Sequence, residues 1–415
     1  MINIVAVALL GATVSPAEYV ASLENAPVLT LEAAQKLAVG ENFDIRIARE
    51  NLARSALLSK KAYSVVLPSV NANYNLIRNN QEIELTIPGA PEPVTIQNLW
   101  QQNAALTFNW TVLNGRSLPL IMNAYDAVDQ SVLQYDQQKE SLTYGTALAY
   151  YNALTAQTTV EIRVRALEIA SRNAELATAQ AELGGATPVD QLRAEVDVAA
   201  AEQALVQAQI SKELSDRSLA VLINRLDERG DIIAFRVVRP DEPQVQEQDL
   251  LDRALAERFD LKLRELDLSI AERSVWETNT KFLPELVVSG AYNWSDVGGF
   301  AGNNTTWNVT FGVQWALFEG GVTFWERKER LYDVETAAIA LEQQKIQIAD
   351  GVKQSQLNLR NAESNFEAAT RRAELARRSA ELAQAQYEVG STTQLEVLDA
   401  NRSLADAETQ EALGR

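Results

Sequence analysis

The sequence of 415 residues contains no cysteine and no histidine. These absences exclude disulfides and thiol chemistry, and they remove the side chains on which most zinc sites and most acid–base catalysts depend. Acidic residues outnumber basic residues by 56 to 37, and the net charge of −19 repels nucleic acid. The sequence contains neither a glycine-rich phosphate loop nor a nucleophile paired with a base. We therefore expect a protein that is not an enzyme and that holds no metal and no cofactor.

Long apolar runs are missing as well. A helix needs about 20 consecutive apolar residues to cross a bilayer, and the sequence has no such run. A membrane role would therefore have to come through strands. The apolar run at 4–12 has no lysine or arginine before it, whereas a secretory signal starts with basic residues. For residues 1–29 we expect an extended N-terminal segment, with a truncated leader over 1–12 as an equal alternative.

The sequence contains one unit twice. Residues of the first half recur 216 positions later, as Glu41, Phe43, Asp44, Leu67 and Pro68 match Glu257, Phe259, Asp260, Leu283 and Pro284. Further along, the matching pairs are Trp110 with Trp315, Gly115 with Gly320, Leu183 with Val389, and Thr187 with Thr393. Between Pro68 and Trp110 the offset falls from 216 to 205, so the first copy should carry a longer exposed loop. We divide the chain into repeat 1 at 30–225, an equatorial linker with a short strand at 226–248, and repeat 2 at 249–415.

Each copy is expected to begin with a helix and to contain one very long helix, at 116–183 and at 321–388. Both segments are rich in Ala, Leu, Gln and Glu, and the proline at 119 lies in a first turn, where proline is tolerated. At 1.5 Å per residue each helix would be on the order of 100 Å long. A turn with glycine and threonine follows each of them, and return helices are expected at 188–225 and 394–413. On composition alone a soluble coiled coil is an equal alternative.

Four short segments, at 68–78, 103–113, 285–295 and 306–318, alternate in polarity at every second residue. In the last of them the odd positions from Trp307 to Leu317 are apolar, whereas the even positions from Asn308 to Gln314 are polar or glycine. An apolar, aromatic face opposite a nearly uncharged Asn and Thr face is typical of an outer-membrane barrel wall. A sheet packed on a core is the alternative, but no second apolar sheet is available. The predicted membrane-facing belt comprises Tyr74, Phe108, Trp110, Tyr292, Trp294, Trp307, Phe311 and Trp315.

Four strands cannot close a barrel. A sheet in a bilayer leaves no open edge, and the smallest membrane barrels have about eight strands. Several copies must therefore assemble, and two, three or four chains would give eight, twelve or sixteen strands. The expected fold class is an α+β membrane protein with an internal twofold repeat.

With these features in place, the sequence resembles the TolC family of outer-membrane efflux channels over essentially its whole length. The segment 387–400 (YEVGSTTQLEVLDA) resembles the second helical-hairpin tip of the family, 183–190 (LGGATPVD) resembles the first, and the Leu-Pro pairs at 67–68 and 283–284 also match. The resemblance implies a homotrimer in the outer membrane of a Gram-negative-type cell. It also implies a twelve-stranded transmembrane β-barrel that continues into a twelve-helix periplasmic α-barrel.

The function implied by this resemblance is a passive exit duct, gated at the periplasmic helical tip, for a tripartite efflux pump or a type I secretion system. Its implied partners are a periplasmic adaptor (membrane fusion) protein, an inner-membrane RND, ABC or MFS transporter, and outer-membrane lipid. A periplasmic coiled-coil structural or adaptor protein is the alternative, against which the strand faces argue.

The implied constriction residues are Glu396 and Asp399, which match two acidic residues that ring the periplasmic end of the tunnel. Their spacing of three places both carboxylates on one helix face, so threefold symmetry would gather six acidic groups that attract cations. Two ordinary solvated charges at a helix end are the alternative. Tyr387 and Asp190 match a gating hydrogen bond between hairpins. Thr392 stands where the type member of the family has an arginine, so one ionic restraint should be missing.

Positions that match the adaptor-contacting tips are Gly184, Gly185, Thr187, Gly390, Ser391 and Thr393. Helix capping and turn formation explain the same residues equally well. The second return helix is expected to be shorter than the first, which would leave the equatorial belt incomplete.

Overall fold

The computed structural model describes residues 27–86, 93–183, 185, 187–227, 229–232, 235–239, 250–298 and 303–414. The predicted leader, the tip residue Gly184 and most of the predicted linker lie outside these residues. The described chain forms two structural units. One unit comprises the described residues of 1–48, 136–256 and 347–415, and the other comprises those of 49–135 and 257–346. The fold is mostly helical with one sheet of four strands, as the predicted α+β class requires.

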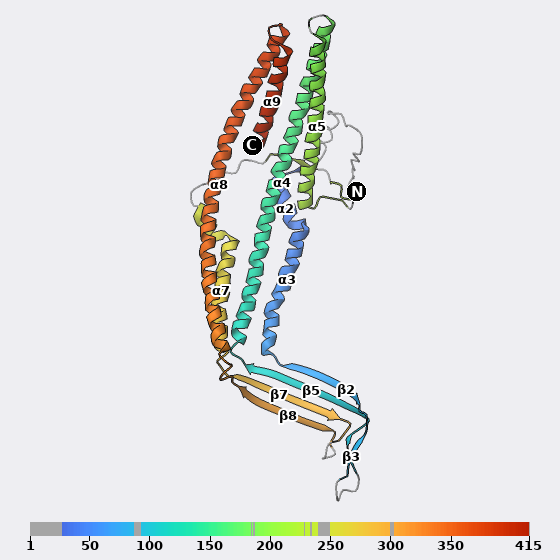
Figure 1. Cartoon of the computed structure of the whole chain (residues 1–415), viewed down its shortest axis with the longest axis vertical. Coiled ribbons are helices and arrows are strands. Elements are labelled where there is room, and N and C mark those ends of the chain that lie inside the picture. The colour runs from blue at the N-terminus through green and yellow to red at the C-terminus, as the bar shows by residue number, and fades with distance from the viewer. Residues whose placement is uncertain are drawn as a thin grey trace. The chain divides into compact units, whose positions relative to one another are not determined.

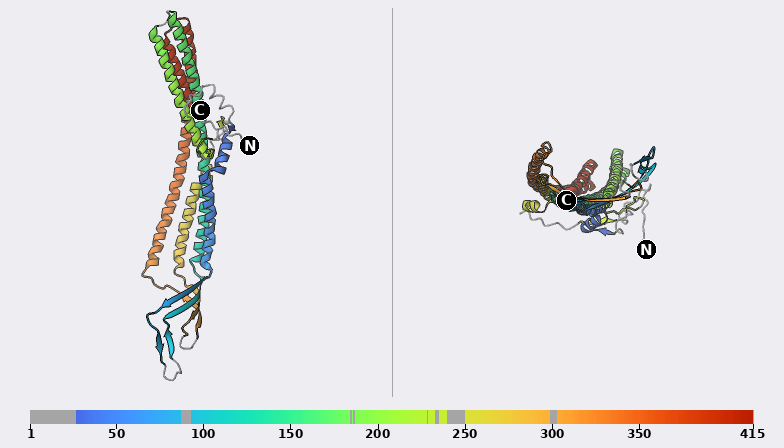
Figure 2. Two further views of the ribbon diagram at one scale, coloured as in Figure 1. Left: turned by 90° about the vertical axis from the view of Figure 1, so that its right-hand side faces the viewer. Right: turned by 90° about the horizontal axis from the view of Figure 1, so that it is seen from below.

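The second unit contains the four-stranded sheet (Figure 1). Its strands are antiparallel and lie in the order β2 (Ser69–Arg78), β5 (Trp100–Leu113), β7 (Glu285–Ser295) and β8 (Thr305–Gln314). The sheet is open and curved, so β2 and β8 each have one edge without a partner strand in the described part of the chain (Figures 1 and 2). A small hairpin of β3 (Ile83–Leu85) and β4 (Val94–Gln97) extends the connection between β2 and β5. The alternation analysis does not predict this hairpin, because its strands are too short to show a period.

The register of the sheet aligns the four apolar faces. Leu106 pairs with Ala72 on one side and with Tyr292 on the other, and Tyr292 pairs with Trp307. Because paired residues of antiparallel strands point to the same side, these positions form one apolar face. The opposite face consists mainly of Asn, Thr and Ser, as in the row Asn71, Thr107, Ala291 and Asn308. The sheet therefore has one aromatic and apolar face and one nearly uncharged polar face.

Helices of this unit are arranged in the same order as the strands that they adjoin. The helices are α3 (Phe43–Tyr63), the start of α4 (Ser117–Glu182), α7 (Phe259–Thr280) and the start of α8 (Val322–Glu388). Tyr63 of α3 stacks edge-on against Tyr125 of α4, and Asp126 of α4 forms an ion pair with Arg273 of α7. Lys281, which follows α7, forms an ion pair with a glutamate of α8. The unit thus consists of four segments, each of which is a strand joined to a helix.

The same hydrogen bond fixes the junction of strand and helix in both halves of the sequence. The indole Nε1 of Trp110 donates to the carbonyl of Val66 at 2.9 Å, and that of Trp315 donates to Phe282 at 3.0 Å. Trp315 is already outside the sheet, because β8 ends at Gln314. The predicted strand end near residue 318 is therefore wrong. The alternation continues in the sequence, but the chain turns here toward two glycines with positive φ, at 320 and 321.

The first unit contains two helical hairpins. One hairpin consists of α4 and α5 (Pro188–Leu222), and the other consists of α8 and α9 (Gln394–Gly414). α9 lies between α8 and the α4/α5 pair (Figure 1). The long helices were predicted at 116–183 and 321–388. α4 begins one residue later and ends one residue earlier than predicted, and α8 begins one residue later.

A small apolar core lies where the strands β1 (Val28–Leu29) and β6 (Arg236–Val237) pair in parallel beside α2 (Leu31–Glu41). The fully buried Tyr150 of α4 places its hydroxyl 2.8 Å from the carbonyl of Leu29 and accepts the N–H of Val238 at 3.0 Å. This one phenol therefore joins both strands to α4. The remaining short helix, α6, spans Leu250–Glu257. Within the described residues, no helix combines the length and the apolar character needed to cross a membrane.

Candidate gate at the helical hairpin tips

The first tip, between α4 and α5, is fixed by a complete capping box. Oγ1 of Thr187 accepts the N–H of Asp190 at 3.3 Å, while the carboxylate of Asp190 accepts the backbone N–H of Thr187 at 3.1 Å and its hydroxyl at 2.7 Å. These hydrogen bonds, with a smaller contribution from Arg193 at 3.6 Å, lower the pKa of Asp190 below its usual value. Pro188 occupies the first helical position, where a missing N–H costs nothing. The predicted gate residue Asp190 is thus engaged within its own helix start.

The second tip, between α8 and α9, is closed by glycine. Gly390 has a φ of 76°, a left-handed conformation that other residues adopt only with strain. Its N–H donates to the carbonyl of Tyr387 at 3.0 Å, and the N–H of Ser391 donates to Gln386 at 2.8 Å. These bonds satisfy carbonyls that the end of a helix would otherwise leave free.

Glu396 and Asp399 lie in the first turns of α9, and both side chains are exposed. The neighbouring Val397 and Leu398 are buried, so the two carboxylates occupy the opposite, open face of the helix. Glu396 also accepts the N–H of Thr393 at 3.4 Å. The arrangement can therefore present two negative charges per chain on one surface, as the spacing predicts.

The structure gives Tyr387 a different partner from the predicted one. Its hydroxyl donates to Oε1 of Gln180 at 2.7 Å, which joins α8 to α4, whereas the carboxylate of Asp190 accepts from Thr187. Burial, and then the negative charge of Asp190, raise the pKa of Tyr387. The two predicted gate residues are therefore close enough to interact electrostatically. Gln180 went unnoticed in the sequence because it is one of many glutamines in an Ala- and Gln-rich helix.

An ion pair between the exposed side chain of Arg402 and the buried one of Asp197 also joins the hairpins, and the sequence analysis missed it. Arg402 of α9 donates through Nε at 3.0 Å and Nη2 at 2.8 Å to one carboxylate oxygen of Asp197 on α5. The side chain of Asp197 is only 12% exposed. A signal was available, because Asp197 lies between Ala194 and Ala201 on a stripe of small residues. A lone acid on such a stripe requires a partner.

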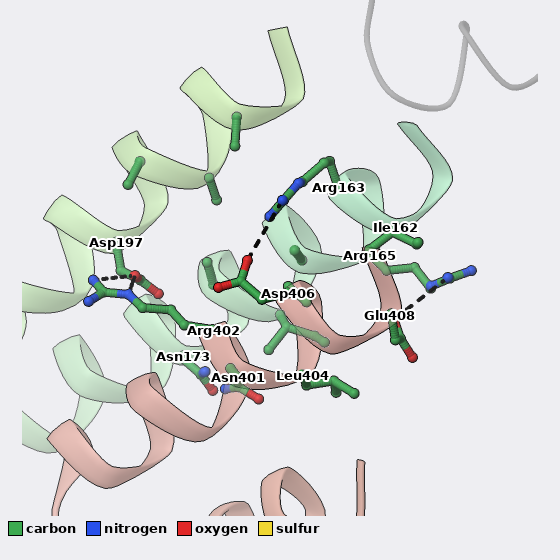
Figure 3. Close-up of a pocket in the computed structure, with 17 residues that line it drawn as sticks. Ile162, Arg163, Arg165, Asn173, Asp197, Asn401, Arg402, Leu404, Asp406 and Glu408 are labelled. Atoms are coloured by element: carbon green, nitrogen blue, oxygen red, sulfur yellow. Dashed lines mark hydrogen bonds and ion pairs between the residues drawn. The ribbon is translucent and has the colours of Figure 1, made fainter. Parts of the chain in front are cut away.

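Two looser ion pairs join α4 to α9 further from the tip (Figure 3). Arg163 lies 3.8 Å from the carboxylate of Asp406, and Arg165 lies 3.8 Å from that of Glu408. Arg377 of α8 donates to the same Glu408 at 2.8 Å. The contact between the hairpins in this structure thus rests on one half-buried ion pair, one phenol hydrogen bond and several weaker surface pairs.

The other predicted tip residues form local turn contacts. Gly185 donates its N–H to Gln180 at 2.8 Å, and the hydroxyl of Ser391 donates to the carbonyl of Gln386 at 3.0 Å. Thr392, where the resembled family's type member carries arginine, is half-buried. These contacts account for the turns and leave the surface role of the tips untested.

Residues of the predicted membrane-facing belt lie on the apolar face of the sheet, apart from Trp315 beyond its end. Trp307 and Phe311 are 75% and 80% exposed, and Tyr74 and Tyr292 are exposed as well. Phe108 and Trp294, on the inner strands, are half-buried by their neighbours. In the described part of the chain, no three acidic side chains converge in a way that could hold a metal ion.

An open sheet with an aromatic face and two long helical hairpins together match a known class. The family described as "Outer membrane efflux protein" matches residues 35–225 and 250–415. The chain therefore belongs to the outer membrane efflux protein family, whose members are channels of the outer membrane that extend into the periplasm and are not enzymes.

The chain is also similar to particular proteins of this kind. The chain is 24% identical over 371 residues to the outer membrane protein TolC of Vibrio cholerae, which covers 87% of this chain and 81% of that protein. Its fold is similar to that of the outer-membrane channel OprN, with a TM-score of 0.76 and 20% identity over 92% of this chain and 86% of that one. The Campylobacter jejuni CmeC outer membrane channel gives a TM-score of 0.77 and 16% identity over 92% and 82%. At these identities the structural likeness concerns the fold alone.

Proposed function

We propose that the chain is one third of a passive exit duct, a homotrimer whose four strands per chain close a twelve-stranded barrel in the outer membrane. The observation that carries this proposal is the pair of unpaired edges on β2 and β8. An open edge in a bilayer leaves backbone N–H and C=O groups without partners, which costs several kcal/mol for each group. Placing β8 of one copy against β2 of the next satisfies both edges.

The matching order of strands and helices supports the same assembly. Because α3 adjoins β2 and α8 adjoins β8, copies that pair through their strands would also bring α8 beside α3 of the next copy. Twelve helices would then continue the barrel as a tunnel into the periplasm. The recurrence of the Trp110 and Trp315 junctions supports an internal twofold repeat, so that six similar units surround the axis.

Engineered disulfides test the assembly, and the absence of native cysteine makes the readout clean. Thr310 of β8 is replaced by cysteine and combined in turn with cysteine at each polar-face position of β2, namely Asn71, Asn73 and Asn75. Oxidation should give a ladder of dimers and trimers on a non-reducing gel, ending at three chains. A ladder that ends at two or four chains, or monomers alone in every combination, would contradict the trimer.

A matched control uses two strands that pair within one chain. Thr107 of β5 and Ala291 of β7 are direct partners, so cysteines at these positions should form a bond without changing the number of chains. This variant reports whether the sheet has formed and whether oxidation was complete.

The duct is gated at the hairpin tips in this proposal. Three copies would gather six carboxylates from Glu396 and Asp399 around a narrow throat, which attracts cations and repels anions. Opening would move α8 and α9 away from α4 and α5, and so break the bonds of Tyr387 to Gln180 and of Arg402 to Asp197. The chain itself offers no source of energy for this step.

The opening energy would therefore come from partners. A periplasmic adaptor protein that contacts the tip residues Thr187, Gly390, Ser391 and Thr393 could pull the hairpins apart, and an inner-membrane RND, ABC or MFS transporter would deliver the substrate. This places the chain at the outer end of a tripartite efflux pump or a type I secretion system. Exposure of Ser391 and Thr393 at the turn supports such a contact.

A further inference from the structure

A cavity of about 360 Å³ lies among α4, α5 and α9, away from the tip turns (Figure 3). Its walls are mostly apolar, and they include Ile162 and Ile169 of α4, Ala201 and Ala204 of α5, and Leu404 of α9. A volume above about 300 Å³ with an apolar lining and few polar groups is typical of a site for a small organic molecule. None of these residues belongs to the proposed throat.

One polar group in the wall has an unused hydrogen bond. Asn173 of α4 is 7% exposed, and its amide nitrogen Nδ2 has no partner. Buried polar atoms of folded proteins nearly always have partners, so an unpartnered donor that lines a cavity indicates an acceptor that is absent here. The amide is the only side-chain donor of this kind among the described residues of the cavity wall.

The charged rim of the cavity holds three arginines, Arg163, Arg165 and Arg402, and three carboxylates, Asp197, Asp406 and Glu408. Arg402 is already engaged by Asp197 through two short bonds. Arg163 and Arg165 lie 3.8 Å from their carboxylates, which is too long for a hydrogen bond, so both guanidinium groups keep donors for another acceptor. An amide and two guanidinium groups are therefore available to donate to an acceptor in the cavity.

We propose that this cavity binds a small aromatic carboxylate. Its rings lie against the isoleucine and alanine walls, and its carboxylate accepts from Nδ2 of Asn173 and from a rim arginine. Walls of isoleucine and alanine offer no polar side chain, which suits an apolar ring system. Such a molecule contacts all three helices at once, so it binds only while α9 is docked on α4 and α5. Occupancy therefore favours the arrangement described here over one with separated hairpins.

The experiment measures binding of 1-naphthoate to the purified trimer by equilibrium dialysis, with detergent micelles alone as the blank. We expect one saturable site per chain above the blank. Ala201→Leu should fill the cavity and weaken binding at least tenfold. The matched control is Ala199→Leu on the exposed side of the same helix, which should leave binding unchanged.

The acceptor contact is tested separately. Asn173→Leu keeps the approximate volume of the side chain but removes the donor, so it should weaken naphthoate binding by about threefold to tenfold. Naphthalene has the same rings without the carboxylate, and its binding should not fall in this variant. Trimer content and helix content of each variant are measured first by size exclusion and circular dichroism, to show that the variant is folded.

Three results would overturn the proposal. These are naphthoate binding that does not exceed the micelle blank, equal effects of Ala201→Leu and Ala199→Leu, and equal binding of naphthoate to the native and Asn173→Leu proteins. Binding is measured without reference to conductance, so it stands or falls independently of the proposed duct and gate.

Discussion

The two hairpin tips have the same order of residues, yet the third residue of the return helix has a different task in each. In the first tip, Asp190 closes a capping box with Thr187 through bonds of 2.7 and 3.1 Å. In the second, Glu396 occupies the equivalent position and receives only the backbone N–H of Thr393, at 3.4 Å. The short acid is held inside its helix start, whereas the longer one keeps its charge on the exposed face. The repeated acid thus fixes the start of the return helix in the first tip and exposes a negative charge in the second.

The two turns also differ in backbone conformation. The connections 183–187 and 389–393 have equal length, but only the second uses a glycine with positive φ among the described residues. Both turns have a backbone bond to the preceding helix, from Gly185 to Gln180 and from Ser391 to Gln386, but only the first tip adds a reciprocal capping box.

Breaking the ion pair between the hairpins should have the largest effect. Arg402→Ala leaves the carboxylate of Asp197, only 12% exposed, without its cation. Because Arg402 is 57% exposed, solvent screens the pair, so its loss should cost about 1–2 kcal/mol, which corresponds to roughly a 5-fold to 30-fold shift toward separated hairpins. Planar-bilayer recordings should show a higher open-state occupancy than the native channel.

The control for this prediction is Arg172→Ala, which removes an ion pair with Glu168 inside α4, where both side chains are 69% exposed. It should change the open-state occupancy little, because exposed pairs contribute under about 1 kcal/mol. Exchanging the charges, with Asp197→Arg and Arg402→Asp together, should restore closure. Equal open-state occupancy of the Arg402→Ala and Arg172→Ala channels would show that the Arg402–Asp197 pair does not hold the gate closed.

Neutralising the acids of the second tip should change ion selectivity. With Glu396→Gln and Asp399→Asn together, the cation-to-anion permeability ratio should fall about tenfold, because rings of acidic groups set cation preference in pores. The reversal potential in a potassium chloride gradient measures this ratio. Asp190→Asn is the matched change in the first tip and should leave the reversal potential in place, since that carboxylate is committed to its cap. An unchanged potential in the double variant would show that these residues do not line the throat.

Local patterns predicted much of this fold. Period-two alternation located all four sheet strands, and uninterrupted Ala-rich composition located α4 and α8 to within one residue at the shifted ends. The first signal arises from which face of a strand is buried, and the second from the helix propensity of the residues, and both can be read from adjacent residues. The end of β8 was misplaced because the alternation of apolar and polar residues continues past Gln314, where the strand ends.

Contacts between the hairpins were harder to predict. Each residue rotates a helix face by about 100°, so the partner of a given side chain depends on the register of two helices that are far apart in sequence. Spacing placed Glu396 and Asp399 on one face, because both lie on the same helix. It could not choose Gln180 as the partner of Tyr387, since that choice depends on how α8 docks on α4.

Replacing the turn glycine should destabilise the second tip more than the first. Gly390→Ala forces a side chain into the left-handed region and should cost about 1–2 kcal/mol at the second tip. Gly185→Ala should cost less, because Gly185 has no positive φ and a Cβ there meets its nearest atom at 3.5 Å. Amide exchange at residues 387–393 reports the first change and exchange at 183–190 the second. Equal acceleration of amide exchange at the two turns would mean that the positive φ of Gly390 imposes no extra cost on a side chain there.

The smallest effect concerns the capping box, and its sign depends on pH. Thr187→Ala should cost about 1 kcal/mol at the start of α5 and Thr393→Ala only a few tenths at the start of α9, because only the first threonine has reciprocal bonds. Since the folded-state pKa of Asp190 lies below its ordinary value of 3.8, the box contributes fully above that value. Its contribution is lost as the pH falls through the lowered pKa. Amide exchange in the first turn of α5 should therefore differ more between the native and Thr187→Ala proteins at pH 6 than in acid below the lowered pKa, where only the bond from the Asp190 N–H to Oγ1 of Thr187 remains. A difference that does not change with pH would mean that the charge of Asp190 adds nothing to the cap.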